Sequence, residues 1–122
     1  MDSKSASAPE VFARVIQLEK RGIVLGDRSA GAVMESMPYM HHVGLDMVTF
    51  YTASVTEANL IMTDGMSLEH TGVTPDEVVL PRAADLASGR DPVLARAVEL
   101  LGGKLSAEDA GKLFPYRWAK LQ

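Results

Sequence analysis

The sequence predicts an α/β fold, a mixed sheet with flanking helices, from three observations. Residues 8–21 carry apolar side chains at helical spacing and lead directly into residues 23–25, a short apolar run typical of a buried parallel strand. Residues 46–55 are rich in β-branched and aromatic residues, as strands are. Residues 78–80 form a second short apolar run after a turn sequence. Helices that alternate with such strands are typical of the α/β class.

The helix predicted for residues 8–21 has clear start and stop signals. Pro9 suits the first turn, where no backbone donor is needed, and the Glu10 carboxylate favours the positive end of the helix dipole. A single apolar stripe defines the face expected to be buried, and it consists of Val11, Phe12, Val15, Ile16 and Leu18. Gly22 is predicted to end the helix.

The middle of the chain predicts strands joined by turns. Residues 27–44, rich in Gly, Ser and Met, are expected to form a loop or an irregular β segment. Residues 60–62 are a further short strand candidate, followed by the turn signal Asp64-Gly65. The strand at residues 78–80 is expected to be short and buried.

Two more helices are predicted toward the C-terminus. The first is capped by Asp91 and opened by Pro92, and its apolar face consists of Leu94, Ala97, Val98 and Leu101. The second begins at Ser106, with Asp109 three residues further on, as in a capping box. The aromatic residues within 114–118 are expected to pack back on the body of the protein.

Composition and charge exclude several function classes. The 122 residues include 12 Lys and Arg against 16 Asp and Glu, and the net charge of -4 argues against a general nucleic-acid binder, which needs a basic face. No cysteine is present, which excludes disulfides, thiolate metal sites and a cysteine nucleophile. No apolar run is long enough to span a bilayer. The length predicts a single domain, and no cofactor is expected.

Ser7 stands at the entrance of the first predicted helix, next to unpaired backbone donors and the positive end of the helix dipole. Both features favour negative charge that develops beside the hydroxyl, which is the requirement for an oxyanion hole. A serine at this position is more often a simple helix cap. Because Ser3 and Ser5 are close by, the residues alone leave the choice of a nucleophile open.

Four segments, in order and with plausible spacing, resemble the C-terminal processing (tail-specific) serine peptidases. They are SASAPEVFA at residues 5–13, RGIVLGDRSAG at 21–31, DGMSLEHTGVTPD at 64–76, and the helix that opens with DPVL at 91–101. Together they cover roughly residues 2–103. Each segment alone is a weak match, but four in register are fairly specific.

This resemblance implies a fold and a set of site residues. The fold would be part of the crotonase-like α/β spiral that these peptidases share with the Clp peptidase. Residues 1–103 would be the C-terminal part of the catalytic domain, and residues 104–122 a helical tail packed on it. Ser7 would be the acylating nucleophile. The backbone N–H of Ala8 would donate to the oxyanion, with a second donor from a segment upstream of this chain.

The sequence departs from one branch of the family and fits another. Many members use a Ser–Lys dyad, but the lysine position corresponds to Ala32, and alanine cannot accept a proton. A tricorn-like branch uses a serine with a histidine and a glutamate, and by resemblance Glu69 would be the acid that orients the histidine. The alternative for Glu69 is a solvated loop carboxylate. In that branch the histidine comes from much earlier in the chain, which argues against His70.

The other two histidines, His41 and His42, are adjacent in a Met-rich segment. Two adjacent histidines are a poor chelate, and no acidic or thiol partner stands at a recognisable ligand spacing, so no metal is expected. A different use of this region is also open, because the strand 46–55 could accept a peptide by edge pairing, although ordinary sheet membership is the default.

The expected function is therefore peptide-bond hydrolysis through an acyl-enzyme on Ser7, with a peptide or protein substrate. The chain is expected to be a fragment that lacks the upstream part of the catalytic domain and its general base, and to be inactive or nearly so alone. The alternative is a non-catalytic ligand- or peptide-binding module on the same scaffold. Open sheet edges predict homo-oligomers. The resemblance implies a periplasmic or other extracytoplasmic location.

Overall fold

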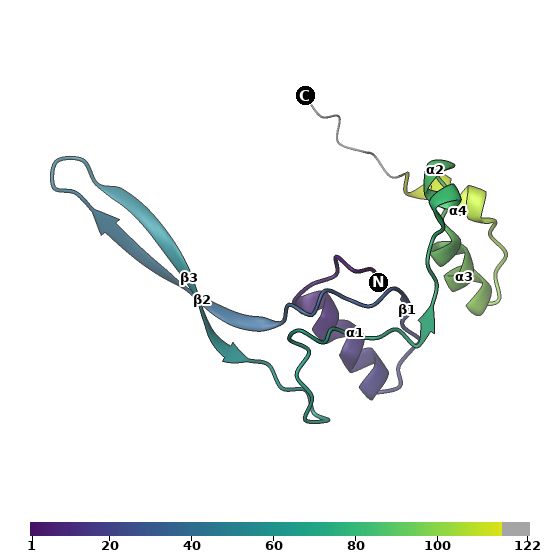
Figure 1. The fold of residues 1–122 in the computed structure, drawn as a ribbon, viewed down its shortest axis with the longest axis horizontal. Coiled ribbons are helices and arrows are strands. Elements are labelled where there is room, and N and C mark those ends of the chain that lie inside the picture. Colours follow the sequence, from purple (N-terminus) through teal and green to yellow (C-terminus); the bar gives the residue numbers. More distant parts are fainter. Residues whose placement is uncertain (116–122) are drawn as a thin grey trace.

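The computed structural model describes residues 1–115, and a long two-stranded arm projects from the rest of the described chain (Figure 1). In chain order the elements are α1 (Ala8–Leu18), β1 (Leu25–Gly26), β2 (Met34–Val43), β3 (Thr49–Asn59), β4 (Glu77–Val78), α2 (Ala83–Ala87), α3 (Pro92–Leu100) and α4 (Ala107–Leu113). Helices and strands are mixed, so the predicted α/β class is confirmed. Within residues 1–115, no helix has the length and apolarity needed to cross a lipid bilayer.

Helix α1 forms where the apolar stripe predicts it, but it ends earlier than expected. The helix closes at Leu18, and Lys20 adopts a left-handed conformation with φ 51. The N–H groups of Lys20 and Arg21 then donate to the carbonyls of Gln17 and Ile16. The left-handed residue that ends the helix is therefore Lys20, and the prediction that Gly22 plays this part is wrong.

A small parallel sheet joins β1 to β4, with Leu25 opposite Glu77. The two strands occur close to where the sequence predicts them, although they are shorter and displaced by one or two residues. Both strands were expected to be buried, but of their apolar residues only Val24 is buried. The side chains of Ile23, Val78 and Leu80 are exposed, with exposed fractions of 60%, 62% and 53%. The reason is the size of the sheet, since two strands of two residues each have little covering them in the described chain.

Strands β2 and β3 form an antiparallel hairpin, and we call residues 34–59 the arm. The arm stands away from the body over most of its length (Figure 1). Of the two alternatives for residues 27–44, a loop or an irregular β segment, residues 34–43 adopt the second, with a register shift between Glu35 and Ser36. Residues 46–55 lie largely in a strand as predicted. Residues 60–62 do not form a strand, and Ile61 makes only a single bridge to Ser67.

The core of the body is small and lies beneath α1. Its buried residues are Val33, Met62, Leu68 and Val73, and the side chains packed against them are Met1, Val11, Ala13, Leu18 and Leu60. These residues bring together α1, the segment before the arm and the segment after it. That arrangement places residues 5–10, 29–33 and 67–73 next to one another.

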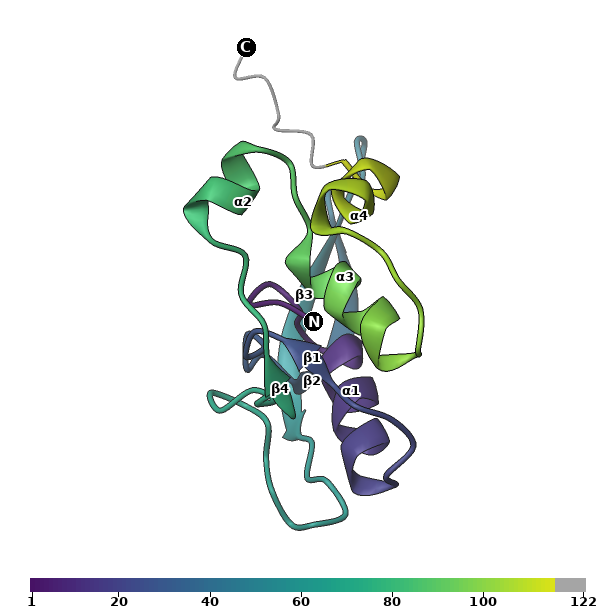
Figure 2. The same ribbon diagram turned by 90° about the vertical axis from the view of Figure 1, so that its right-hand side faces the viewer.

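Three helices follow β4, and α3 packs on α4 (Figure 2). Both predicted caps are confirmed: the Leu94 N–H donates to Asp91 at 2.9 Å, and the Asp109 N–H donates to the Ser106 hydroxyl at 3.1 Å. The short helix α2 was not predicted. On the expected apolar face of α3, Leu101 is 89% exposed and is not part of a buried stripe.

The expected packing of the aromatic residues in 114–118 is not seen for Phe114, which is 76% exposed. The remaining residues of that stretch lie outside the described part of the chain. An ion pair links the C-terminal helices to the body: Arg96 of α3 donates to Glu77 of β4 at 2.7 Å. Hydrogen bonds to Glu77 and Glu99 raise the pKa of Arg96 above its usual value.

Candidate functional site

Ser7 occupies a strained turn immediately before α1. Its backbone has φ 63 and ψ -125. Residues other than glycine rarely adopt this combination, and it costs about 1–3 kcal/mol. Its side chain is exposed, and the Glu10 N–H that a serine cap would satisfy donates instead to the Ser7 carbonyl at 2.9 Å. The Ser7 hydroxyl makes no side-chain cap hydrogen bond, so Ser7 is not a simple cap.

Backbone hydrogen bonds hold this turn against the segment that precedes the arm. The Ser7 N–H donates to the Ala32 carbonyl at 2.9 Å, and the Ala30 N–H donates to the Ser5 carbonyl at 2.9 Å. These two bonds pair residues 5–7 with residues 30–32 in the manner of a short strand contact. A strained turn persists only where its surroundings fix it, and this pairing supplies part of that constraint.

The Glu10 carboxylate supplies the remaining constraint on the strained Ser7 turn. Glu10 is fully buried, yet both of its oxygens are satisfied. One oxygen accepts from the Ser29 hydroxyl at 2.5 Å and the Gly31 N–H at 2.7 Å. The other accepts from the Ser7 N–H at 2.9 Å and the Ala32 N–H at 3.0 Å. We call Glu10 with these four donors the carboxylate clamp.

The clamp extends to the segment that carries Glu69. The Ser29 hydroxyl, which donates to Glu10, also accepts from the Val73 N–H at 2.6 Å. The Gly31 carbonyl accepts from the His70 N–H at 2.8 Å. A continuous network of hydrogen bonds therefore connects the Ser7 turn to residues 70–73.

Glu69 is fixed by the same neighbourhood. Its carboxylate accepts from the Val33 N–H at 2.7 Å, and its side chain is 21% exposed. This geometry excludes a freely solvated loop carboxylate. One oxygen lies 3.8 Å from the His70 ring, whose side chain is 90% exposed. Among the hydrogen bonds of residues 1–115 none joins Ser7 to Glu69 directly, and the two are linked through the backbone of Ala32 and Val33.

A groove opens beside Ser7. Its volume is about 580 Å³, and its lining is almost entirely apolar: Ser7, Ala8, Val11, Phe12, Val15, Val33, Met34, Glu35 and Leu60. The Ala8 N–H lies at this groove as the first N–H of α1, and the first N–H groups of a helix have no acceptor within it. The Ser7 hydroxyl, the N-terminus of α1 and the apolar groove therefore lie next to one another.

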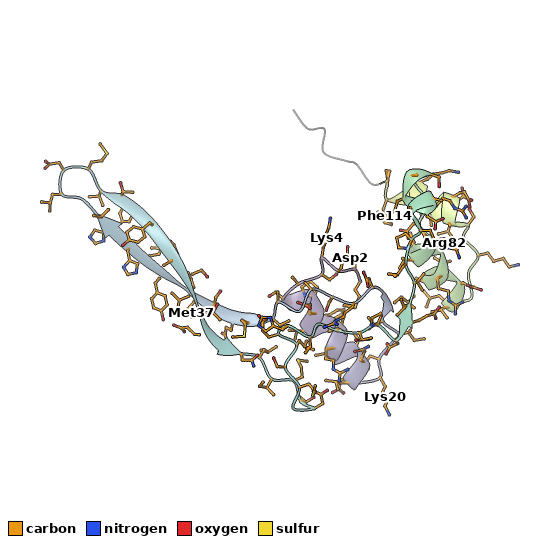
Figure 3. All side chains as sticks on the ribbon, viewed as in Figure 1. Asp2, Lys4, Lys20, Met37, Arg82 and Phe114 are labelled. Carbon is orange, nitrogen blue, oxygen red and sulfur yellow. The ribbon has the colours of Figure 1, made fainter. Side chains whose placement is uncertain are left out.

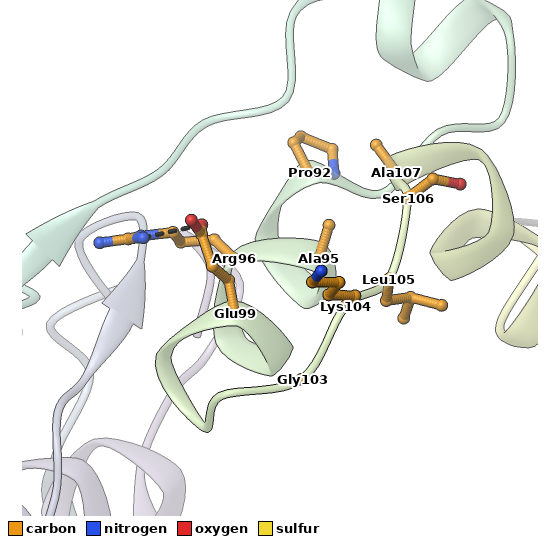
Figure 4. Close-up of a pocket in the computed structure, with 9 residues that line it drawn as sticks. All are labelled: Pro92, Ala95, Arg96, Glu99, Gly103, Lys104, Leu105, Ser106 and Ala107. Carbon is orange, nitrogen blue, oxygen red and sulfur yellow. Dashed lines mark hydrogen bonds and ion pairs between the residues drawn. The ribbon is translucent and has the colours of Figure 1, made fainter.

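Other features predicted from the sequence lie elsewhere. His41 and His42 lie on β2, with their rings next to Tyr51 and Phe50 at centroid distances of 5.4 and 6.1 Å. Across residues 1–115, no group of three His, Asp or Glu side chains could hold a metal ion. A hollow of about 550 Å³ between α3 and the loop to α4 includes Arg96 and Lys104 in its lining but none of the predicted site residues (Figure 4).

The clamp is the part of the site that sequence reasoning missed. The sequence assigned Glu10 only a favourable position in the helix dipole, and Ser29 received no role. The available signal was the glutamate three residues after Ser7, because a capping-box glutamate accepts from the N-cap N–H, as Glu10 does here.

The pKa of Glu10 gives a testable consequence. Burial alone would raise this pKa, but hydrogen bonds from Ser29, Gly31, Ala32 and Ser7 together lower it below its usual value. The carboxylate therefore contributes stability that is present above its unfolded-state pKa and is lost as the pH falls through the lower folded-state value. We expect the stability gap between the native chain and Glu10→Gln to narrow through the acidic range, as measured by urea unfolding. A gap that does not change with pH would contradict an ionised clamp.

The chain belongs to peptidase family S41, because the family model matches residues 1–79. Among solved structures it is similar to the crystal structure of the tricorn protease, with a TM-score of 0.65 and 25% sequence identity. This match covers 79% of the chain and 9% of the tricorn protease chain. No curated protein sequence matches the chain. The resemblance to the tail-specific peptidases and their tricorn-like branch is confirmed, and the α/β fold is similar to that of the tricorn protease.

Proposed function

We propose that this chain carries the nucleophile of a serine peptidase and that Ser7 is that nucleophile. The observation that carries the proposal is the strained Ser7 backbone, φ 63 and ψ -125, at the start of α1 and beside the apolar groove. Strained backbone clusters at functional sites, and a serine on a sharp turn into a helix presents its hydroxyl to a substrate. Membership of peptidase family S41 supports the same class of reaction.

The chemistry follows the acyl-enzyme route. The Ser7 oxygen attacks the carbonyl carbon of a peptide bond while a general base takes the hydroxyl proton. The N–H of Ala8 donates to the oxygen that becomes negative. The C–N bond then breaks, the amine leaves with the proton from the base, and water hydrolyses the Ser7 ester to release the acid.

The general base is the part that we assign to no residue of this chain. Ala32 stands where a Ser–Lys dyad would place its lysine, and its carbonyl and N–H are both engaged in holding the Ser7 turn. His41 and His42 lie on the arm. A histidine from another segment, as in the tricorn-like branch, would complete the site. We therefore expect the 122-residue chain by itself to hydrolyse peptides very slowly or not at all.

Glu69 would orient that histidine. The bond from the Val33 N–H fixes one of its oxygens, so the other is available to accept from an imidazole N–H. The role of such an acid is to set the tautomer of the histidine and to stabilise the imidazolium that forms. The apolar groove beside Ser7 favours a peptide with apolar side chains near the cleaved bond.

The test is labelling by a fluorophosphonate probe, applied to this chain and to a longer polypeptide that supplies the base. We expect labelling at Ser7 in the longer protein and its loss in Ser7→Ala. Ser5→Ala is the matched control, because the Ser5 hydroxyl is bonded to Asp2 at 2.9 Å. Labelling that persists in Ser7→Ala would overturn the assignment. A folded longer protein that no probe labels would favour the binding module.

A further inference from the structure

Residues 29–33 run between the two parts of the candidate site, and we call them the central segment. Figure 3 shows the side chains of the body gathered around α1, whereas those of the arm reach into solvent. The central segment carries backbone hydrogen bonds on two sides. One set reaches the Ser7 turn, and the other reaches residues 70–73, where the Ser29 N–H donates to the Val73 carbonyl at 3.1 Å. The central segment is therefore paired with both parts of the site at once.

Ser29 connects the same two parts through its side chain. It is buried, and its hydroxyl donates to Glu10 at 2.5 Å and accepts from the Val73 N–H at 2.6 Å. A serine hydroxyl has one donor and two acceptor sites, so it makes both bonds at once. The other three donors of the carboxylate clamp are backbone N–H groups. Ser29 is therefore the one donor of the clamp that a side-chain substitution can remove.

The two bonds of the Ser29 hydroxyl strengthen each other. A hydroxyl that donates to an ionised carboxylate makes a short, strong bond, and its polarised oxygen becomes a better acceptor for the Val73 N–H. Burial raises the pKa of Glu10, and among the hydrogen bonds that lower it again the one from Ser29 has the largest effect. Ser29 therefore supports both the charge of the clamp and the position of Val73.

The central segment also fixes Glu69 relative to the clamp. At one end of the segment the Ser29 hydroxyl bonds to Val73, and at the other end the Val33 N–H donates to the Glu69 carboxylate at 2.7 Å. Because both bonds involve one short segment, a shift of residues 69–73 along it would break the bond to Ser29 and move Glu69 relative to Ser7.

We propose that Ser29 is a positioning residue for the nucleophile. Its hydroxyl holds Glu10 against the Ser7 N–H, and it thereby keeps the strained Ser7 turn in place and in register with Glu69. This inference rests on the proposed role of Ser7 as the nucleophile. A residue that contributed only to stability would leave the Ser7 backbone unchanged in any variant that still folds, so the conformation of Ser7 is the decisive observable.

The test is NMR spectroscopy of the isotope-labelled full chain and of two matched variants. Ser29→Ala removes the bridging hydroxyl. Thr71→Ala removes a hydroxyl from the neighbouring segment, where it donates to the Ser67 carbonyl at 2.8 Å. The one-bond coupling between Cα and Hα of Ser7 is smaller at positive φ than in helices or strands, so it reports the strained conformation directly.

We expect this coupling to rise toward the value of an ordinary helical or extended residue in Ser29→Ala and to keep its native value in Thr71→Ala. The pKa of Glu10, measured on the same samples, should rise in Ser29→Ala, because a donor to the charged carboxylate is lost. In a longer polypeptide that supplies the base, fluorophosphonate labelling of Ser7 should slow by about tenfold or more in Ser29→Ala, as the loss of a hydrogen bond to a charged group implies. Thr71→Ala should label at the native rate.

An unchanged Ser7 coupling in a folded Ser29→Ala chain would overturn the inference, and so would an equal change in Thr71→Ala. The coupling is measured without any activity, so these results would leave the proposed function standing. A native longer protein that the probe does not label would instead overturn the role of Ser7 as nucleophile. Should Ser29→Ala fail to fold, Ser29→Cys keeps a similar shape with a weaker donor, and an unchanged Ser7 coupling in that variant would equally overturn the inference.

Discussion

Replacing Glu10 by alanine is expected to lower the free energy of unfolding by about 4 kcal/mol. The change removes the acceptor of four hydrogen bonds at a fully buried position. It leaves the Ser29 hydroxyl and the N–H groups of Gly31 and Ala32 without an acceptor, while the Ser7 N–H keeps its bond to the Ala32 carbonyl. Each buried donor left unpaired costs about 1–3 kcal/mol, reduced where the site relaxes or admits water. Urea unfolding followed by circular dichroism measures the change.

Two further variants distinguish the stability that the clamp contributes from the effect of replacing any glutamate on the same helix. Glu10→Gln keeps the shape of the side chain but places an amide N–H₂ against donors, so it should lose roughly half as much stability as alanine. Glu19→Ala, at the exposed C-terminal end of the same helix, should stay within about 0.5 kcal/mol of the native chain. Similar losses for Glu10→Ala and Glu19→Ala would contradict the clamp.

Replacing Gly72 by alanine is expected to cost about 2–4 kcal/mol, for two reasons that add. Gly72 has φ +65, where a side chain is strained by about 1–2 kcal/mol. A Cβ there would also lie 2.6 Å from the Ser29 carbonyl oxygen and 3.0 Å from its hydroxyl oxygen, so the backbone must shift. Because that hydroxyl donates to Glu10, the shift would also disturb the clamp.

Gly65→Ala is the matched control for Gly72→Ala. Gly65 has φ +81, but nothing lies within 4 Å of its added Cβ, so this variant carries the conformational strain without the collision. Thermal unfolding of both variants should therefore show a clearly larger loss for Gly72→Ala. Equal losses would mean that the close approach of Ser29 to Gly72 contributes nothing.

Local signals in the sequence predicted much of the fold. The helix signals of α1 and the caps Asp91 and Ser106 act over a few residues, and the structure confirms the helix and both caps. The predicted buried face of α1 is only partly covered, because Phe12 and Val15 are 68% and 41% exposed. The sequence left β2 open as a loop or an irregular β segment, because its serine, histidine and proline residues are weak or unfavourable strand formers. Its pairing with β3 decides its conformation. The early end of α1 depends on a left-handed Lys20, which no composition rule indicates.

The sequence likewise indicates only some of the site residues. Ser7 could be singled out as a residue at a helix entrance, and family resemblance directed attention to it. The function of Glu10 could not be predicted, because its donors Gly31 and Ala32 stand 21 and 22 residues away in the sequence. Nor does spacing indicate that Glu69 is bonded to the Val33 N–H, 36 residues away.

These long separations have a consequence for the order of folding. Ser29 and Val73, which extend the clamp, are 44 residues apart, and contacts that close such long loops form later than local helices do. During synthesis, α1 can form early while the turn before it stays relaxed. The strained serine would then exist only after Val73 has left the ribosome and docked. Folding itself would thus control when the proposed nucleophile is presented, and an unfinished chain would carry Ser7 on a relaxed turn.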